Sequence, residues 1–321
     1  MKRFVPALAL LLASALPSFA AWTVNDGANP DATGRRVEVQ KDGKLVARFI
    51  YGEGEIKPYL QLFGVEGDSL NEWGKEQKFP HHRGFYIGWN KIAYEPEAGK
   101  KQTVDLWHFN KGGSMSVTKI EKAEARPDSV TIVADIEWRG NTKDAQGEHL
   151  LLKERRELVI SQPDSKMNQV DATFALTAAR DLRLDGDLQH AGVHFRGSKE
   201  LVERAKETSY TWEPEVPSKN GKAESTEFKW ALLTFPIGQR WYSATLLNAP
   251  KNPVEELSTR DYGRFGFFFK KDLKADENLT LRYRLVTQLE GEQKGEVTAE
   301  DTARMRKVAQ EEYQAFTSVL K

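Results

Sequence analysis

Runs in which apolar and polar residues alternate recur along almost the whole chain, and they limit the possible folds more than any other feature. A period of two is the pattern of a strand with one buried face, and Gly, Asn, Asp and Pro mark the turns between such runs. We expect strands over residues 36–40, 45–51, 59–63, 84–89, 103–109, 116–120, 129–138, 150–160, 169–178, 190–196, 228–235, 241–247, 265–269 and 279–289. This pattern predicts an all-β protein, built as a large antiparallel two-sheet β-sandwich.

A single helical pattern stands at the end of the chain, over residues 299–318. Thr298 and Asp301 have the spacing of a capping box. An apolar stripe follows, made by Ala303, Val308, Ala309, Tyr313 and Phe316. We therefore expect one sandwich domain over residues 21–297 and a helix packed on it over residues 298–321.

The first twenty residues have the pattern of a secretory signal peptide. Lys2 and Arg3 precede an apolar run over residues 4–16, and Ser18-Phe19-Ala20 resembles a cleavage site. We expect residues 1–20 to be removed from an exported protein, periplasmic or extracellular. The chain has 0 cysteines, which excludes disulfides, zinc–thiolate sites and thiol nucleophiles. Its 47 basic and 47 acidic residues point to neither nucleic acid nor an anionic membrane, and no later segment is apolar enough to span a bilayer.

The segment Pro80-His81-His82-Arg83-Gly84 combines two of the six histidines with an arginine. If the following strand begins only at Gly84, a turn over residues 80–83 would let His81, His82 and Arg83 point at one ligand. The alternative is that the histidines hydrogen-bond a loop to the core. Clusters of ionisable side chains mark pockets, and we therefore favour a functional site.

A second cluster lies in the predicted strand over residues 190–196. Residues two apart in a strand share a face, so His190, His194 and Arg196 are expected on one side, with Gly192 leaving room above the backbone. This face would form the floor of a ligand groove. The alternative is an ordinary strand that faces solvent.

Three further segments add candidates. Trp107 and His108 could provide an aromatic platform and another imidazole, or Trp107 could lie in the core with His108 in solvent. Arg260 and Tyr262 are expected in a polar loop at the edge of a sheet. Residues 197–227 have no clear period and are expected to form a long loop, whereas His149 is expected in an exposed turn.

The motifs around residues 80–84, 105–107, 192–196, 252–253 and 260–263 resemble the ordered landmarks of a large bacterial family of secreted proteins of unassigned function. Members of that family are often labelled "methane oxygenase PmoA". The label does not describe this chain, because that membrane subunit is a polytopic helical protein and this sequence contains no spanning helix. The resemblance implies a context of saccharide utilisation and keto-sugar processing.

These patterns lead to a first hypothesis, an exported enzyme that acts on a saccharide or an oxidised keto-saccharide by hydrolysis, elimination or epimerisation. Mutarotases and polysaccharide lyases use sandwich faces of this kind with His, Tyr, Arg or Glu as acid and base. The predicted catalytic residues are His81, His82, Arg83, His194 and Arg196. The predicted substrate-binding residues are Trp107, His108, His190, Arg260 and Tyr262.

Three alternatives stay open. The cofactor is unknown, and a divalent metal bound by His81, His82, His190 and His194 is a variant of the enzyme hypothesis. The second hypothesis is a non-catalytic periplasmic carbohydrate-binding protein. The third is a structural or assembly partner that uses residues 197–227.

Overall fold

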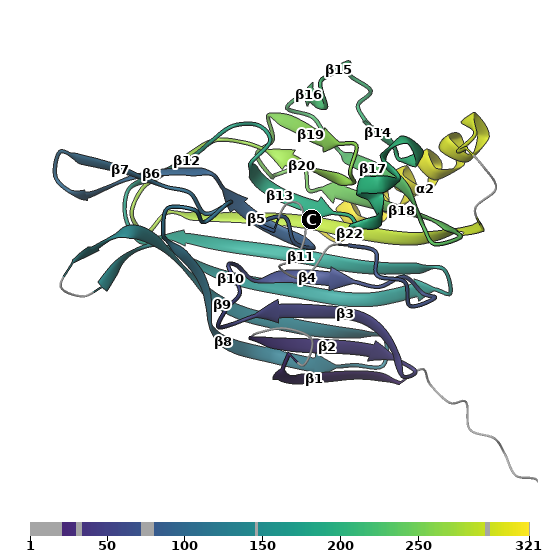
Figure 1. The fold of residues 1–321 in the computed structure, drawn as a ribbon, viewed down its shortest axis with the longest axis horizontal. Helices are drawn as coiled ribbons and strands as arrows, with labels where there is room; N and C mark the ends of the chain where they lie inside the picture. The colour runs from purple at the N-terminus through teal and green to yellow at the C-terminus, as the bar shows by residue number, and fades with distance from the viewer. Residues whose placement is uncertain (1–20, 30–33, 72–79, 145–146, 293–295, 321) are drawn as a thin grey trace, which may run out of the picture.

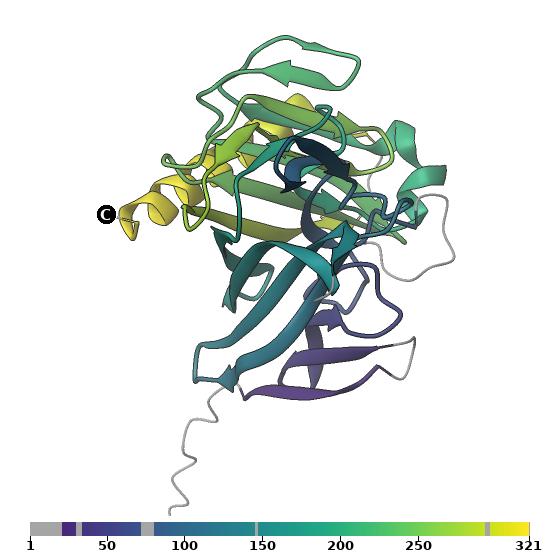
Figure 2. The ribbon, with the colours of Figure 1, turned by 90° about the vertical axis from the view of Figure 1, so that its left-hand side faces the viewer.

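The computed structural model describes residues 21–29, 34–71, 80–144, 147–292 and 296–320, so the predicted signal peptide lies outside the described residues. The described residues form three sheets, and all pairings between the named strands are antiparallel. The all-β prediction is therefore confirmed. Seen from the side, the purple strands near the N-terminus and the teal strands that follow form separate layers (Figure 2).

A ten-stranded sheet forms one layer of the sandwich. Its strands are, in spatial order, β1 (Trp22–Ala28), β2 (Arg35–Lys41), β3 (Lys44–Tyr51), β4 (Tyr59–Leu62), β5 (Phe85–Trp89), β13 (Ala191–Arg196), β20 (Arg264–Phe268), β19 (Glu256–Arg260), β16 (Lys222–Glu224) and β15 (Ser218–Lys219) (Figure 1). Strands far apart in the sequence thus meet at its centre, where β5, β13 and β20 are neighbours.

An eight-stranded sheet forms the second layer. Its order is β14 (Ser209–Glu213), β17 (Trp230–Ile237), β18 (Arg240–Asn248), β22 (Asn278–Glu292), β11 (Met167–Ala178), β10 (Gly147–Asp164), β9 (Ser129–Asp144) and β8 (Ser114–Ala125). A smaller sheet of β21 (Lys271–Leu273), β12 (Leu182–Asp185), β6 (Lys91–Glu97) and β7 (Lys100–Val104) stands at one end, with β6 and β7 projecting to the left in Figure 1.

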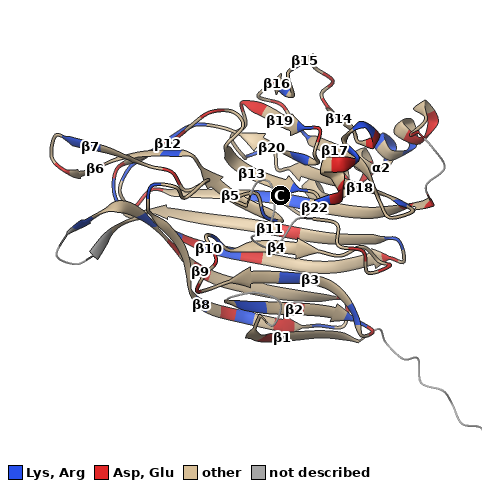
Figure 3. Cartoon of the chain, viewed as in Figure 1, with Lys and Arg blue, Asp and Glu red and all other residues tan. Residues whose placement is uncertain are grey.

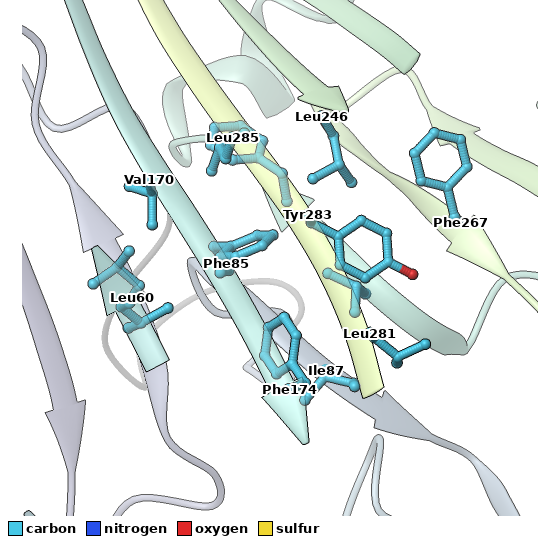
Figure 4. Close-up of a cluster of buried hydrophobic side chains, with 14 of the residues drawn as sticks. Leu60, Phe85, Ile87, Val170, Phe174, Leu246, Phe267, Leu281, Tyr283 and Leu285 are labelled. Carbon is cyan, nitrogen blue, oxygen red and sulfur yellow. The ribbon is translucent and has the colours of Figure 1, made fainter. Parts of the chain in front are cut away.

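The main core fills the space between the two large sheets. Figure 4 shows Phe85 and Phe267 of the ten-stranded sheet among side chains of β11, β18 and β22. The rings of Phe85 and Phe174 lie 6.1 Å apart across the core. Each such side chain contributes about 1.5–3 kcal/mol when fully buried, so the alternating residues of both sheets supply the main stabilisation.

The C-terminal helix α2 (Ala299–Ser318) packs on the outer face of the eight-stranded sheet, through Met305, Ala309 and Phe316. The predicted capping box of Thr298 and Asp301 is present. Ala303, which the predicted stripe included, is exposed. Within the described residues, the helices are either too short or too polar to cross a membrane.

Several predicted loops contain regular structure. Residues 197–227 include α1 (Glu200–Glu203), a 3-10 turn over Ala205–Glu207, and strands β14, β15 and β16. Arg260 ends strand β19 instead of lying in a loop. The predicted strand over residues 103–109 is wrong beyond Val104, because the chain turns there. His149 is buried, and its Nδ1 lies 3.2 Å from an Nη2 atom of Arg180.

Basic and acidic residues are mixed over the strands in the view of Figure 3. The chain has equal numbers of the two charges, 47 and 47. It gives no support to a large surface of one sign, of the kind that binds nucleic acid.

Candidate active site

Five of the six histidines meet on the outer face of the ten-stranded sheet, opposite the main core. They come from the turn before β5, the turn after β7, the turn before β13, and β13 itself. Trp107 lies between them and is fully buried. We call this group the imidazole cluster; its ring centroids are 4.1 Å apart for His81–His82, 4.5 Å for His81–His108, 4.8 Å for His108–His190, 4.8 Å for Trp107–His194, 5.7 Å for Trp107–His82 and 6.0 Å for Trp107–His190.

The turn before β5 allows His81 and His82 to point to the same place. The strand starts at Phe85, one residue later than predicted, and residues 80–83 precede it as an irregular turn. Neighbouring residues of a regular strand would point to opposite faces. The predicted arrangement of these two histidines is therefore present.

The turn after β7 places Trp107 and His108. The Asp105 carboxylate accepts hydrogen bonds from the backbone amides of Trp107 at 2.9 Å and His108 at 2.8 Å, which closes a tight turn. Gly88 makes room for it, because a Cβ atom there would collide with the carbonyl oxygen of Leu106. Since Trp107 is fully buried, its predicted role as a platform for a sugar is wrong, and the indole is instead the centre about which the imidazoles pack.

Two histidines of the cluster are paired with carboxylates. Nδ1 of His108 lies 2.9 Å from Oδ2 of Asp105, and Nδ1 of His190 lies 2.8 Å from Oδ1 of Asp187. The side chains of His108 and His190 are 25% and 29% exposed. Burial acts to raise the pKa of both aspartates, but the hydrogen bonds from histidine and from backbone amides outweigh it and lower the pKa. Both carboxylates are thus ionised partners that orient partly exposed imidazoles.

The other three imidazoles are held neutral. Burial, reinforced by the nearby Arg264 guanidinium, lowers the pKa of His82 and of His194 well below the usual value. Burial and the neighbouring His108 and Lys57 lower the pKa of His81 to about 3. These shifts give no support to a proton shuttle at His82 or His194 near neutral pH, which stays a prediction.

The hydrogen bonds of His194 also require a neutral imidazole. Its Nε2 lies 2.9 Å from the carbonyl oxygen of Ala191 and donates to it, so Nδ1 is the acceptor and lies 3.3 Å from Nη1 of Arg264. His82 accepts a bond of 3.3 Å from the Trp107 indole at Nε2. His82 and His194 are thus the buried members of the imidazole cluster.

The two predicted arginines also have supporting roles. Arg83 forms a buried ion pair with Glu55 and donates from Nε to the carbonyl oxygen of Pro80 at 2.7 Å. Arg196 donates to the carbonyl oxygens of Gly197 and Tyr262 and lies 4.8 Å from the Tyr262 ring centroid. Both guanidinium groups therefore form bonds within the protein, and their predicted catalytic role stays a prediction.

Of the remaining predicted residues, Tyr262 contacts the imidazole cluster and Arg260 bonds elsewhere. The Tyr262 ring lies 6.2 Å from the His82 ring and belongs to the cluster, whereas Arg260 donates to the carbonyl oxygens of Asn220 and Thr259. Gly192 does not leave room for a ligand. Its φ is +92°, and a Cβ atom there would collide with the carbonyl oxygen of Phe267.

The structure adds two basic side chains that the sequence did not single out. Lys57 is fully buried, with Nζ donating to the Trp107 carbonyl oxygen at 3.1 Å and lying 4.1 Å from the Tyr86 ring centroid. Burial, together with the nearby Arg83, lowers the pKa of Lys57 well below its usual value. Arg264 is also fully buried, beside His194. Its position was open to prediction, because Arg264 and Gly266 alternate with Phe265 and Phe267 as His194 and Arg196 do with Val193 and Phe195.

The metal variant gains no support. Among the described residues, no group of three or more His, Asp or Glu side chains has the arrangement of a metal site. Of the four proposed ligands, His194 has both ring nitrogens bonded within the protein.

A protein-family model described as "Family of unknown function (DUF6807)" matches residues 36–303. The chain belongs to this DUF6807 family. The match covers all the segments of the imidazole cluster. It gives the family no activity, and the resemblance to the family labelled PmoA-like, suggested by the sequence motifs, stays a prediction.

No curated protein matches this DUF6807 chain in sequence. Among solved structures, it is similar to a galactose mutarotase-like protein from Lactobacillus casei ATCC 334, with 12% identity and a TM-score of 0.39 over 83% of this chain and 100% of that one. It is also similar to a mutant of the heparan sulfate lyase HepC from Pedobacter heparinus, with 11% identity and a TM-score of 0.35 over 90% of this chain. The chain spans 38% of the length of that lyase.

Proposed function

We propose that this protein is an exported carbohydrate-active enzyme that transfers protons on a saccharide or an oxidised keto-saccharide, by elimination or epimerisation. The observation that carries the proposal is the pair of carboxylate-oriented imidazoles, His108 with Asp105 and His190 with Asp187, whose rings lie 4.8 Å apart and are partly exposed. They replace His82 and His194 as the catalytic residues.

The geometry suits acid–base catalysis. With Nδ1–H held by a carboxylate, a neutral imidazole presents Nε2 as a base, and its conjugate acid donates from the same atom. In epimerisation, one imidazole removes the proton from the carbon beside a carbonyl, and a protonated imidazole returns one to the other side. In elimination, the carbon–hydrogen and carbon–oxygen bonds break, a double bond forms, and the second imidazole protonates the departing oxygen.

Hydrolysis, the third reaction considered, has weaker support. Glycoside hydrolases typically use two carboxyl groups as acid and as base or nucleophile. Near the cluster, Asp105 and Asp187 are bonded to histidines, and Glu55 is bonded to Arg83. The described residues therefore supply proton-transferring imidazoles more readily than a pair of free carboxyl groups.

The saccharide and the exported location rest on the sequence. The motif resemblance implies a sugar context, and the first twenty residues have the pattern of a signal peptide. The main alternative is a non-catalytic carbohydrate-binding protein, in which the same imidazoles would only hydrogen-bond sugar hydroxyls. Measurement of proton transfer distinguishes the two.

The test is to incubate the protein in D2O with oligosaccharides, unmodified and oxidised at C3, with and without added divalent metal. Deuterium at carbon is followed by NMR and new products by mass spectrometry. We expect the wild type to exchange or convert the keto-saccharide, and His108→Gln and His190→Gln to be slower by about 100-fold to 10,000-fold.

The matched control is His149→Gln, because His149 is the one histidine outside the cluster. It should retain wild-type rates. Equal rates in all four proteins would reject the assignment of His108 and His190. Saccharide binding without any exchange would favour the binding protein.

A further inference from the structure

The hydroxyl of Tyr86 lies at the base of the imidazole cluster. Tyr86 is fully buried, and within the described part of the chain its hydroxyl has no hydrogen-bond partner. The same holds for Nε of Arg264, although both Nη atoms of that guanidinium are bonded, Nη1 to the Gln189 carbonyl oxygen and His194 Nδ1, and Nη2 to Ser258. Buried tyrosine hydroxyls usually find a partner. The hydroxyl of Tyr283 in the main core also has none in the described part of the chain, so the Tyr86 hydroxyl is of interest for its position beside the imidazole cluster.

The two groups lie around the same side chains. Tyr86 is the strand partner of His194, with ring centroids 6.3 Å apart, and lies 5.1 Å from Trp107. The Arg264 guanidinium lies 3.3 Å from His194 Nδ1 and 5.9 Å from the Trp107 ring centroid. Both side chains therefore lie on the outer side of the sheet, around Trp107, whose ring is also 6.0 Å from that of His190.

The region contains a permanent cation, Arg264. Nζ of Lys57 also lies 4.1 Å from the Tyr86 ring centroid, but burial lowers the pKa of this lysine and so disfavours its charged form. Burial raises the pKa of Tyr86, so its phenol keeps its proton and acts as a donor at neutral pH. A protonated phenol beside a guanidinium suits an acceptor that carries negative charge.

We infer that the Tyr86 hydroxyl and Nε–H of Arg264 bind a negatively charged oxygen of the substrate. This inference rests on the proposed function and identifies an oxyanion subsite for it. Two sources share this chemistry, the enolate oxygen that forms when a proton leaves the carbon beside a carbonyl, and the carboxylate of a uronic acid. In the first, the electron pair of the broken carbon–hydrogen bond moves to the carbonyl oxygen, and both donors stabilise it without transferring a proton.

Access to the subsite involves a stack of three rings. His82 lies between Tyr86 at 6.4 Å and Tyr262 at 6.2 Å, with interplanar angles of 20° and 18°. Tyr262 is the partly exposed member. Because Tyr86 itself is fully buried, binding requires displacement of the rings above it.

The test removes one oxygen atom. Tyr86→Phe is compared with Tyr283→Phe, the same change in a tyrosine that is fully buried in the main core. We expect Tyr86→Phe to lower turnover of the keto-saccharide by about 100-fold while its melting temperature stays equal to or above that of the wild type. Tyr283→Phe should leave turnover unchanged. Turnover within twofold of the wild type, or turnover and melting temperature falling together, would show that the hydroxyl binds no transition state.

A binding measurement keeps the inference separate from the reaction. Sodium glucuronate and glucose are the probes, and thermal stabilisation is measured for the wild type and both tyrosine variants. Glucuronate stabilisation that is lost in Tyr86→Phe identifies a carboxylate, even if the His108 and His190 variants show the proposed reaction to be wrong. Loss of keto-saccharide turnover alone identifies the enolate oxygen. An unchanged Tyr86→Phe protein in both measurements, or a wild type that shows neither effect, would overturn the subsite.

Discussion

The two faces of strands β5, β13 and β20 are both buried, but by different kinds of side chain. On the inner face, Phe85, Val193 and Phe267 pack against the eight-stranded sheet (Figure 4). On the outer face, the alternate residues Tyr86, His194 and Arg264 pack beneath Trp107 and the histidine-bearing turns. One run of backbone thus supports an apolar core on one side and a polar cluster on the other.

The apolar inner face and the polar outer face contribute differently to the stability of the fold. Burial of apolar area stabilises the inner face directly. Burial of a polar group costs free energy unless that group is hydrogen-bonded, and within the described residues this holds for the hydroxyl of Tyr86 on the outer face and for that of Tyr283 in the main core. The outer face differs in how many polar and charged side chains it buries, among them Lys57, His194 and Arg264, and this concentration favours a functional role.

The largest effect on stability is expected from the inner face. Phe195→Ala removes a fully buried ring that packs 6.2 Å from Phe235 and 5.7 Å from Phe265, and should lower the free energy of unfolding by about 3–5 kcal/mol. Phe195→Leu, which keeps most of the volume, should cost less than about 1.5 kcal/mol. Urea denaturation measures both. A larger loss in His194→Gln, the adjacent outer-face variant, would contradict the contrast between the faces.

The inner face could be predicted from the sequence almost residue by residue. Alternation identified Phe85, Ile87 and Trp89 as one buried face, and all three belong to the main core. The start of the C-terminal helix could also be predicted, because the spacing of Thr298 and Asp301 is a local signal that needs no tertiary contact. Short edge strands such as β15 and β21 were missed, since a few residues carry too little periodicity.

The outer face could be predicted only as a set of segments. Rare histidines beside arginines and tryptophan drew attention to the correct turns, but their roles depend on contacts between strands far apart in the sequence. Arg83 forms an ion pair with Glu55, which is 28 residues away in the sequence. The proposed acid–base histidines depend on Asp105 and Asp187, and the local sequence pattern did not distinguish these two aspartates from ordinary turn residues. Nothing in the sequence around Lys57 distinguishes it from a surface lysine. Its burial beside Trp107 depends on the tertiary fold.

Acidification should lower the free energy of unfolding through the buried histidines of the outer face. The folded-state pKa of His82 and His194 is depressed below the unfolded value of 6.5, so below that pH the unfolded chain binds protons that the folded chain does not. Their contribution is fully present above pH 6.5 and is lost as the pH falls towards the folded-state pKa. At about pH 5, each of the two should have lost about 2 kcal/mol of stability.

Urea denaturation at about pH 8 and pH 5 measures this loss, in a range where most carboxylates are still ionised. His82→Gln and His194→Gln should each flatten the dependence, whereas Tyr283→Phe on the inner face should not change it. A wild-type stability that is the same at both pH values would mean that the two imidazoles are not held neutral in the folded protein.

The smallest effect on stability is expected at the exposed rim of the cluster. The side chain of Asp187 is 53% exposed and that of its partner His190 is 29% exposed. Because exposed ion pairs contribute little, Asp187→Asn should change the free energy of unfolding by less than about 0.5 kcal/mol. It should nevertheless reduce proton transfer at least about tenfold, because the amide no longer stabilises the protonated imidazole or fixes its orientation.

The matched variant is Asp272→Asn, which breaks an exposed pair with Arg183 on the four-stranded sheet, where the side chains are 73% and 43% exposed. Its stability should change as little, and its rate of proton transfer should equal that of the wild type. The two variants remove the same charge at similar exposure, so a difference in rate between them comes from position alone. Equal rates of proton transfer in Asp187→Asn and Asp272→Asn would show that the Asp187–His190 pair is an ordinary surface contact. The outer face would then be more polar than the inner face but would have no catalytic role.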